Sequence, residues 1–270
     1  MTVRVLLVGC GNMGYAMLSG WLSSGKLAAS ETLVVEPNED LRHRAGRLGS
    51  IVAASNGELP GNLSPDIIVI AVKPQVIREV VAGYKGFAGK STFLSIAAGT
   101  ATATFTEILG AGAAVMRCMP NTPAAIGKGM MVVFSNPDVA EKTKAFVGDL
   151  LSASGEVATI NDEGLMDAVT AVSGSGPAYV FHFIECLTAA AEKAGLPPET
   201  AKLLAMQTVY GAASLAATSR EDPAVLRKQV TSPNGTTAAA LDVLMSGDRL
   251  KTLLADAVEA ARARSVELGK

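Results

Sequence analysis

The sequence has few of the residues from which metal sites and disulfide frameworks are built. Its 270 residues include three cysteines, Cys10, Cys118 and Cys186, which are widely separated and show no CxxC spacing. An odd and scattered set of this kind predicts neither a disulfide framework nor a zinc site. We therefore expect reduced cysteines, a cytoplasmic location and no bound metal.

Basic clusters and long apolar runs are also missing. The formal net charge is −2 and the lysines and arginines form no run, whereas nucleic acids and acidic membranes bind concentrated basic surfaces. Apolar stretches are interrupted before the ~18 residues that a membrane span needs. The strand-like Val3–Val8 leads into glycines rather than into a signal-peptide cleavage region. We expect a soluble protein that binds a small molecule, with neither nucleic acid nor membrane as a partner.

Histidine is nearly absent, which limits the acid/base chemistry open to the chain. His43 lies in a charged segment, and His182 lies on an apolar helical segment, where a core histidine is more common than a catalytic one. His182 and Glu185 share a helix face at spacing i, i+3. Two possible ligands without a third predict no metal site.

The first part of the chain alternates short β-rich runs with helical stretches. Runs such as Ile67–Val72, apolar on both faces, are typical of a parallel sheet covered by helices. The expected strands are Val3–Val8, Thr32–Val35, Asp66–Val72, Thr92–Ile96, Ala113–Met116, Met130–Phe134 and Glu156–Ile160. The pattern predicts the α/β class, with a Rossmann-type dinucleotide-binding domain at residues 1–160.

From Asp162 onward the β-branched runs disappear, and alanine, leucine, methionine and glutamate dominate. The expected helices are Glu163–Ala171, Ala178–Ala194, Pro198–Ala217, Pro223–Val230, Thr236–Met245 and Arg249–Leu268. Ala-rich helices pack closely but bury little bulk, so pairing with a second copy would enlarge their core. We predict an all-helical dimerisation domain at residues 161–270.

A Gly9-x-Gly11-x-x-Gly14 fingerprint follows the first strand and opens a helix expected to end near Ser23. The first glycine allows a tight turn, the second lets the backbone approach a pyrophosphate, and the third lets the helix pack against the strand. An acidic residue, Glu36, ends the second strand. Together these features predict a dinucleotide site.

Glu36 leaves the choice of cofactor open. An acid at this position bonds the ribose 2′-OH and repels a 2′-phosphate, which favours NAD over NADP. Asn38, Arg42 and Arg44 lie just beyond, however, and could receive a phosphate if Glu36 turned away.

Small residues lie where further strands end, at the sheet edge that a cofactor must approach. Ala71–Pro74 and Ala97–Gly99 follow two expected strands, and Lys73 is either a solvated strand-end charge or a cofactor contact. Cys118–Pro123 follows another strand, and its two prolines fix the backbone around Asn121.

Two clusters of Gly, Ser, Thr and Pro, Ser173–Pro177 and Thr231–Thr237, interrupt the helical half. Such residues weaken helix interiors. At helix starts they expose free N–H groups and hydroxyls, which together make a neutral cradle for a small anion such as a carboxylate. We therefore expect a small-acid site besides the nucleotide site.

Five segments together resemble pyrroline-5-carboxylate reductase. They are Gly9–Gly14, Ala71–Pro74, Cys118–Pro123, Ala168–Tyr179 and Val230–Thr237, and they span nearly the whole chain. The resemblance implies reduction of L-1-pyrroline-5-carboxylate to L-proline, the last step of proline biosynthesis, by hydride from NADPH, with NADH possible. It also implies an active site at the interface of an interlocked homodimer, with dimers often gathered into decamers.

The resemblance also implies roles for individual residues. Thr237 would be catalytic, close to the imine nitrogen, and Glu163 would lie near the dimer-mate's site. The substrate would be bound by Glu163, Ser173, Gly174, Ser175, Gly176, Pro177, Ser232, Gly235, Thr236 and Thr237. The cofactor would be bound by Gly9, Cys10, Gly11, Asn12, Met13, Gly14, Glu36, Pro37, Asn38, Asn56, Ala71, Val72, Lys73, Pro74, Ala97, Ala98, Gly99 and Asn121.

One loop departs from the family's pattern. The chain has Ser232-Pro233-Asn234-Gly235 where the family commonly has Ser-Pro-Gly-Gly. Asparagine is the non-glycine residue that best tolerates left-handed backbone angles, so we expect the same loop shape.

Two other functions share parts of the pattern. A hydroxyacid dehydrogenase needs a base, usually a lysine on the first long helix of its second domain, and Pro177–Leu187 contains no lysine. A nucleotide sensor would bind NAD(P) and signal through its dimer interface without turnover, and it would have no use for a second, Ser/Thr-rich pocket. A protonated cyclic imine needs only a hydride donor, a carboxylate anchor and a hydroxyl near nitrogen, which suits a chain poor in histidine.

Overall fold

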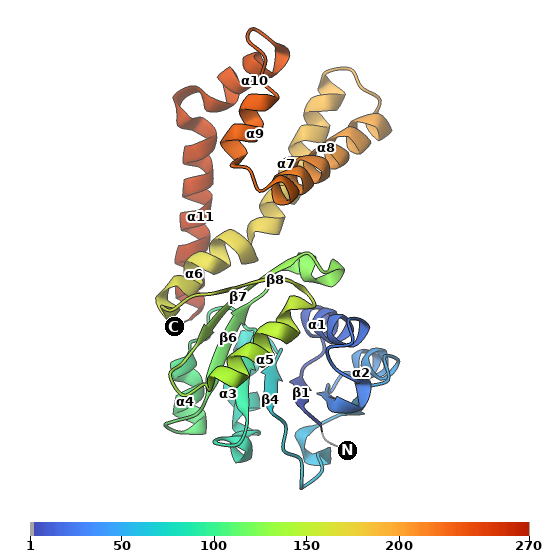
Figure 1. The fold of residues 1–270 in the computed structure, drawn as a ribbon, viewed down its shortest axis with the longest axis vertical. Coiled ribbons are helices and arrows are strands. Elements are labelled where there is room, and N and C mark those ends of the chain that lie inside the picture. The colour runs from blue at the N-terminus through green and yellow to red at the C-terminus, as the bar shows by residue number, and fades with distance from the viewer. Residues whose placement is uncertain (1–2, 270) are drawn as a thin grey trace. The chain divides into compact units, whose positions relative to one another are not determined.

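The computed structural model describes residues 3–269. The chain forms two compact units (Figure 1). The first unit is the chain up to Ser175 together with the segment from Ala261, and the second unit is Gly176–Ala260. The boundary expected after residue 160 falls inside the first unit, because side chains of residues 163–173 and 265 make their contacts there.

An eight-stranded sheet in the order β3-β2-β1-β4-β5-β6-β7-β8 forms the first unit. Neighbouring strands are parallel except β6 and β7, which are antiparallel. The strands are β1 (Val5–Val8), β2 (Thr32–Val35), β3 (Ile51–Ala53), β4 (Ile67–Ile70), β5 (Thr92–Ser95), β6 (Val115–Met119), β7 (Gly129–Ser135) and β8 (Gly155–Thr159). Every expected strand forms, which confirms the α/β fold. The edge strand β3 was missed because its three residues carry too little apolar pattern.

Helices cover both faces of the sheet, as the apolar pattern of its strands requires. Val5 and Leu7 pack in the same core as α1 (Asn12–Ser23), α2 (Glu39–Gly46) and α5 (Glu141–Ser152). Leu6 and Val8 pack on the other side with α3 (Ile77–Ala82) and α4 (Thr102–Leu109). This doubly wound arrangement places ligands beyond the carboxyl ends of the strands.

Short helical turns connect these elements. They are η1 (Ala29–Glu31), η2 (Asn56–Glu58), η3 (Pro74–Val76), η4 (Lys85–Phe87), η5 (Thr122–Ile126) and η6 (Glu163–Leu165), followed by α6 (Met166–Val169) and the π-helical turn η7 (Thr170–Gly174).

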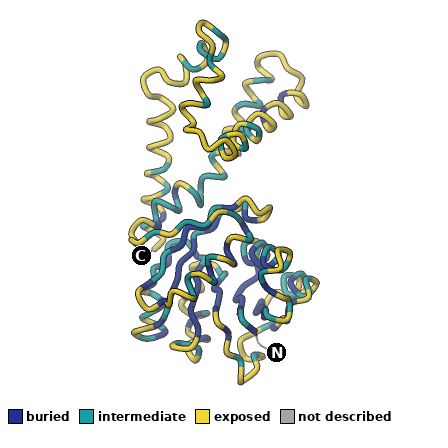
Figure 2. Tube along the Cα trace, in the orientation of Figure 1, coloured by how far each residue is buried: buried dark blue, intermediate teal, exposed yellow. Residues whose placement is uncertain are grey.

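The second unit is helical, as expected. It contains α7 (Gly176–Lys193), α8 (Pro198–Ser219), α9 (Pro223–Gln229), α10 (Thr236–Met245), η8 (Ser246–Asp248) and the first part of α11 (Arg249–Leu268). Most of its trace is exposed (Figure 2). Among its described residues, only Ala201 and Ala205 are buried apolar residues, whereas Phe181 and Tyr210 are 58% and 59% exposed. A single copy of this unit therefore has almost no hydrophobic core.

Over the described part of the chain, no helix combines the length and the apolar character that crossing a bilayer requires.

Candidate functional site

In the glycine loop between β1 and α1, two glycines have no room for a side chain and one glycine faces open space. Gly9 has φ +90°, and a Cβ on it would lie 2.7 Å from the Ala71 carbonyl oxygen. A Cβ on Gly14 would lie 2.6 Å from the Gly9 carbonyl oxygen, so α1 packs directly on the loop. A Cβ on Gly11 would meet no described atom within 4 Å. The first and third glycines therefore serve packing, and the second leaves room for a ligand.

The N-terminus of α1 suits an anion. Its N-cap is Gly11, and none of the described side chains caps it. An uncapped helix start carries unpaired N–H groups and partial positive charge, which together bind phosphate groups. The open space at Gly11 and the uncapped helix start thus fit the pyrophosphate of a dinucleotide.

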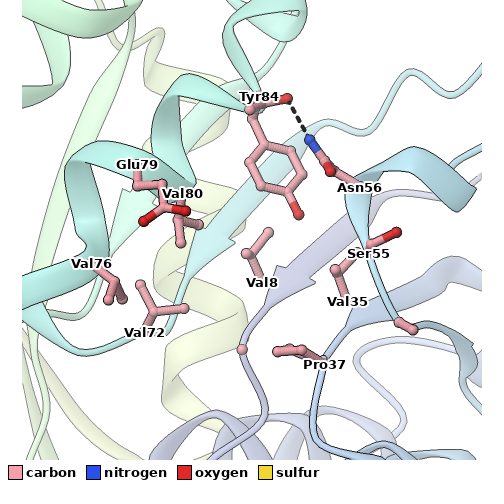
Figure 3. A pocket seen from close by; sticks show the side chains of 13 residues that line it. Val8, Val35, Pro37, Ser55, Asn56, Val72, Val76, Glu79, Val80 and Tyr84 are labelled. Atoms are coloured by element: carbon pink, nitrogen blue, oxygen red, sulfur yellow. Dashed lines mark hydrogen bonds between the residues drawn. The ribbon is translucent and has the colours of Figure 1, made fainter.

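A cavity of about 430 Å³ adjoins this loop (Figure 3). Four of its lining residues were expected to bind the cofactor: Gly9, Pro37, Asn56 and Val72. The other lining residues were not predicted from the sequence; they are Val8, Val35, Ala54, Ser55, Val76, Glu79, Val80, Gly83 and Tyr84. Several of them lie on α3 or after β3, and recognising β3 would have pointed to Ser55.

The residues that line the cavity are largely apolar. The Asn56 amide donates a hydrogen bond to the Gly83 carbonyl (3.2 Å). Burial raises the pKa of the Tyr84 phenol to about 12, so this hydroxyl stays neutral at physiological pH. Such a cavity, with a few polar groups at its rim, is of the kind that holds the adenosine end of a dinucleotide.

Glu36 has not turned away from the glycine loop. Its carboxylate accepts the backbone N–H groups of Cys10 (2.6 Å) and Asn38 (3.0 Å), and the residue is only 6% exposed. The negative charge therefore stays at the end of β2.

The two neighbouring arginines hold the backbone around the acid. Arg42 donates from Nη1 to the carbonyls of Glu36 (2.9 Å) and Pro37 (3.0 Å). Arg44 donates from Nη2 to the carbonyl of Cys10 (3.0 Å), and its guanidinium carbon lies 4.0 Å from the centre of the Tyr15 ring. Both guanidinium groups thus already donate to backbone carbonyls, whereas the sequence left open whether they receive a phosphate.

The cysteine in the glycine loop is a packed residue and not a nucleophile. Cys10 is buried, and burial raises the pKa of its thiol to about 11, with Arg44 lowering and Glu36 raising it. Burial also raises the pKa of the Cys118 thiol to about 12. Only thiolates react readily.

We expect Cys10 and Cys118 to resist alkylation in the folded protein. Because both pKa values lie well above pH 8, less than about one thiol in a hundred is ionised there. Mass spectrometry after iodoacetamide treatment at pH 8 measures this, with the denatured protein as the control. Rapid alkylation of Cys10 in the native protein would contradict its placement.

The remaining expected cofactor residues follow the other strand ends. Lys73 is exposed and precedes η3, which begins at Pro74. The N–H of Ala97 donates to the Ser95 hydroxyl (3.3 Å) in the turn after β5. Ala98 and Gly99 line a further cavity of the first unit together with Pro74. Asn12 and Met13 open α1, so these residues share the carboxyl edge of the sheet.

The side chain of Asn121 contacts Ser173, the first residue of the Ser173–Pro177 cluster. Its Nδ2 donates to the carbonyl (3.2 Å) and the hydroxyl (3.4 Å) of Ser173, and its Oδ1 accepts the N–H of Met130 (2.8 Å). The side-chain amide is thereby used to fix Ser173 next to η5. A cofactor contact of Asn121 stays a prediction.

The first Gly/Ser cluster does not begin a free helix, which corrects the expectation for Ser173–Pro177. Ser173 and Gly174 end the π-helical turn η7, and the N–H of Ser175 donates to the Thr170 carbonyl (2.8 Å). Gly176 and Pro177 are the first residues of α7. The chain thus keeps helical hydrogen bonding where the sequence indicated a break, and π-turns of this kind occur often at functional sites.

The second cluster does begin a helix. Gly235 is the N-cap of α10, and Thr236 and Thr237 are its first two residues. No side chain of the described residues caps this helix start, so its N–H groups and hydroxyls have the composition expected of a carboxylate cradle. Asn234 has φ +59°, which confirms the left-handed conformation expected of it.

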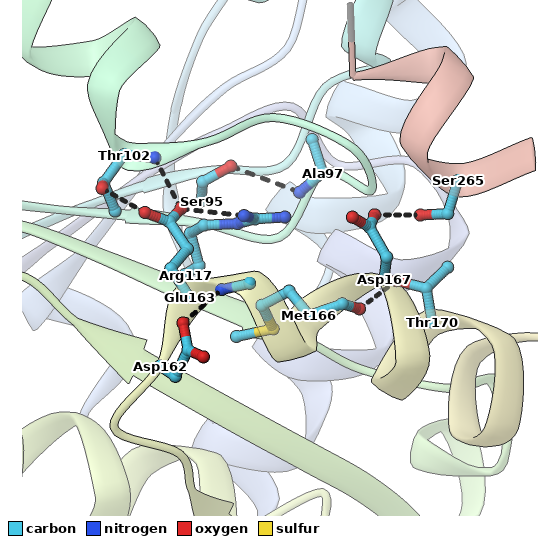
Figure 4. Close-up of polar contacts among 11 residues, drawn as sticks. Ser95, Ala97, Thr102, Arg117, Asp162, Glu163, Met166, Asp167, Thr170 and Ser265 are labelled. Carbon is cyan, nitrogen blue, oxygen red and sulfur yellow. Dashed lines mark hydrogen bonds and ion pairs between the residues drawn. The ribbon is translucent and has the colours of Figure 1, made fainter. Parts of the chain in front are cut away.

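Glu163, expected to bind substrate, is engaged inside the first unit (Figure 4). Its Oε1 accepts the Thr102 N–H (2.7 Å) and Arg117 Nη1 (2.8 Å), and its Oε2 accepts the Thr102 hydroxyl (2.6 Å). These contacts over long sequence separation left no sign in the sequence pattern.

The imidazole–carboxylate pair noted on α7 does form. His182 Nδ1 lies 2.9 Å from Glu185 Oε2, and the Cys186 sulfur lies 3.6 Å from His182 Nε2. Within residues 3–269, no group of His, Cys, Asp and Glu side chains is arranged to hold a metal ion.

Comparisons with known proteins extend along the whole chain. The family model described as pyrroline-5-carboxylate reductase dimerisation matches residues 163–268, and the model described as NADP oxidoreductase coenzyme F420-dependent matches residues 4–99. A pyrroline-5-carboxylate reductase from Pseudomonas aeruginosa is 39% identical over 100% of this chain and 98% of its own.

Solved structures give the same result. The structure of a pyrroline-5-carboxylate reductase from Coxiella burnetii has a TM-score of 0.93 and 34% identity, covering 100% of both chains. The pyrroline carboxylate reductase of Plasmodium falciparum, solved with NADP bound, has a TM-score of 0.85 and 31% identity, covering 99% of this chain and 98% of its own. With such identity along its whole length, this chain belongs to the pyrroline-5-carboxylate reductase family, as its five motifs predicted.

Proposed function

We propose that the protein reduces L-1-pyrroline-5-carboxylate to L-proline, the last step of proline biosynthesis, at the expense of a reduced nicotinamide dinucleotide. The observation that carries this proposal is the start of α10, where Thr236 and Thr237 follow an uncapped Gly235. This site offers N–H and hydroxyl groups and no charged base. That composition suits a substrate with a carboxylate to anchor and an imine nitrogen to hydrogen-bond.

In this reaction the residues of the chain bind and orient the substrate and the nucleotide. When bound, the reduced nicotinamide supplies a hydride to the imine carbon. The imine carries a proton on nitrogen, so hydride addition at the carbon leaves a neutral secondary amine, and we assign the hydroxyl of Thr237 to hydrogen-bond that nitrogen. Ser173, Gly174, Ser175, Gly176, Pro177, Ser232 and Gly235 would orient the rest of the substrate. Gly11 and the start of α1 would hold the pyrophosphate.

Turnover tests the proposal. The initial rate of nucleotide oxidation is measured with pyrroline-5-carboxylate, in parallel with NADPH and NADH, and the proline formed is quantified. Consumption of one nucleotide per proline is expected. Binding of both nucleotides without consumption of either would refute the reductase function and favour a sensor.

The geometry of Glu36 bears on the choice between the nucleotides. The resemblance implies NADPH, with NADH possible. Glu36, however, keeps its carboxylate at the end of β2, where it accepts two backbone N–H groups. A 2′-phosphate near this charge would be repelled, so we propose that NADH is used at least as well as NADPH.

Replacing Glu36 by serine is expected to raise the ratio of kcat/KM for NADPH to that for NADH about tenfold or more. The reason is the removal of one unfavourable charge pair, an effect of about 1.4 kcal/mol or more. Glu39→Ser is the matched control, because Glu39 is an exposed carboxylate in the first turn of α2. An unchanged ratio in Glu36→Ser would place the ribose away from this acid.

The second unit is proposed to pair with a second copy. Support comes from its exposed apolar side chains, such as Phe181, Phe183 and Leu203, and from the dimerisation model that matches this part of the chain. An active site shared between the two copies, and decamers built from dimers, are further proposals. Three cysteines without disulfides favour a cytoplasmic location.

A further inference from the structure

We propose that Glu163 is a positioning residue that fixes the segment between β5 and α4, and not a substrate ligand. This inference rests on the proposed reductase function. Glu163, Thr102 and Arg117, here called the Glu163 network, join three parts of the first unit: η6, the start of α4 and the middle of β6 (Figure 4).

Helix α4 begins at Thr102. Its N-cap is Ala101, which has no side-chain acceptor, so the helix lacks a cap of its own. Glu163 supplies the acceptor from another part of the chain, because it receives both the N–H and the hydroxyl of Thr102 (2.7 and 2.6 Å). A carboxylate at this end of a helix also interacts favourably with the helix dipole. The start of α4 is therefore fixed by Glu163.

Arg117 is the second partner of Glu163. Its side chain is 9% exposed and that of Glu163 is 23% exposed, so their ion pair (2.8 Å) is largely out of water. A buried guanidinium needs a charged or hydrogen-bonding partner, and removing that partner leaves it uncompensated. Arg117 stands on β6 just before Cys118–Pro123, so the network also holds the strand that leads into this loop.

The Glu163 network anchors the segment between β5 and α4. Residues 96–101 connect β5 to Thr102 and include Ala97, Ala98 and Gly99, which were expected at the cofactor edge. The Ser95 hydroxyl holds the beginning of the segment through the Ala97 N–H. Gly99 lies against the end of α11, since a Cβ on it would be 3.3 Å from the Gly269 nitrogen. Glu163 holds the other end, so the segment is fixed at three places.

Residues 163–173 lead from this segment to the Gly/Ser cluster Ser173–Pro177. Glu163 precedes α6, whose Asp167 accepts the hydroxyl of the buried Ser265 on α11 (2.6 Å). Ser173, which follows Asp167 by a few residues, is the first residue of the Gly/Ser cluster and accepts a hydrogen bond from Asn121. Residues 163–173 therefore connect the cofactor-edge segment to the substrate motif. If residues 96–101 were displaced, the hydride donor and the imine carbon would be misaligned. The rate of hydride transfer falls steeply when the reacting atoms are misplaced.

Glu163→Gln tests the inference, since glutamine keeps the size and loses the charge. We expect kcat to fall roughly tenfold to a hundredfold, with little change in KM for pyrroline-5-carboxylate or in nucleotide Kd measured by fluorescence. Hydrogen exchange of the full-length protein, followed by mass spectrometry, should become roughly tenfold faster over residues 96–109, because the start of α4 opens more often.

Two further variants complete the design. Thr102→Val removes only the hydroxyl donor, so its effects should be of the same kind but smaller, and they should be non-additive with Glu163→Gln. Glu107→Gln is the matched control on α4, because Glu107 forms an exposed ion pair with Arg78 at the far end of that helix. It should leave kinetics and exchange unchanged.

The outcomes separate the possibilities. A raised KM with unchanged kcat and unchanged exchange would make Glu163 a substrate ligand and overturn the inference. Faster exchange without a fall in kcat, a fall in kcat without faster exchange, or no change at all would overturn it as well. Wild-type protein without turnover would instead refute the proposed function, and the exchange measurement would still decide whether Glu163 fixes residues 96–109.

Discussion

Thr237→Ala is expected to lower kcat/KM for pyrroline-5-carboxylate about tenfold to a hundredfold, the equivalent of one or two hydrogen bonds in the transition state. Thr237 is the second residue of α10 and follows directly on the turn that contains Asn234 (φ +59°) and the N-cap Gly235. The threonine hydroxyl is the group assigned to the imine nitrogen. Nucleotide affinity should stay nearly unchanged, because the glycine loop belongs to the other unit.

Thr237→Ser is the control, since it keeps the hydroxyl and removes only a methyl group. It should retain most of the activity, which would separate the loss of a hydrogen bond from the loss of packing. Circular dichroism of each variant verifies that the overall helical content is unchanged. If Thr237→Ala has the kcat/KM of the wild type, Thr237 does not contact the imine nitrogen.

Gly11→Ala is expected to weaken nucleotide binding about a hundredfold while leaving the fold intact. A methyl group on Gly11 would meet no described atom within 4 Å, and its backbone angles of φ −60° and ψ −167° are accessible to alanine. The methyl would instead occupy the space through which the backbone approaches the pyrophosphate. Nucleotide Kd from fluorescence titration and the thermal midpoint are the two measurements.

Gly14→Ala provides the contrast. Its methyl group would lie 2.6 Å from the Gly9 carbonyl oxygen, so α1 must shift, at a cost of about 1–3 kcal/mol in the free energy of unfolding. Gly61→Ala is the matched control, because a Cβ there also meets nothing within 4 Å and the residue lies far from the loop in sequence. Gly11→Ala with the nucleotide affinity of the wild type would contradict the placement of the pyrophosphate.

The sequence predicted those parts of the fold that have a local cause. Strands such as Ile67–Ile70 are apolar on both faces, and α1 runs from Asn12 to Ser23 between glycines. The left-handed angle of Asn234 followed from the chemistry of one residue. The three-residue β3 did not, because its pairing with β2 stabilises it more than its own pattern does.

Other features depend on contacts between distant residues and could not be predicted. The π-turn at Thr170–Gly174 forms where a local break was indicated. Glu163 contacts residues 61 and 46 positions away in the chain, and Asn121 turns toward Ser173, 52 positions away. Motifs thus indicate candidate residues of the site, whereas the contacts of these residues depend on the tertiary fold.

Transfer of deuterium is the most direct test of the proposed reduction. The wild-type protein is incubated with pyrroline-5-carboxylate and with NADPH or NADH deuterated at C4 of the nicotinamide on the transferring face, and the product is analysed by mass spectrometry and NMR. Hydride transfer to the imine carbon predicts one deuterium per proline, located on the δ carbon. Proline without deuterium, for either face of the nucleotide, or no proline at all would contradict it.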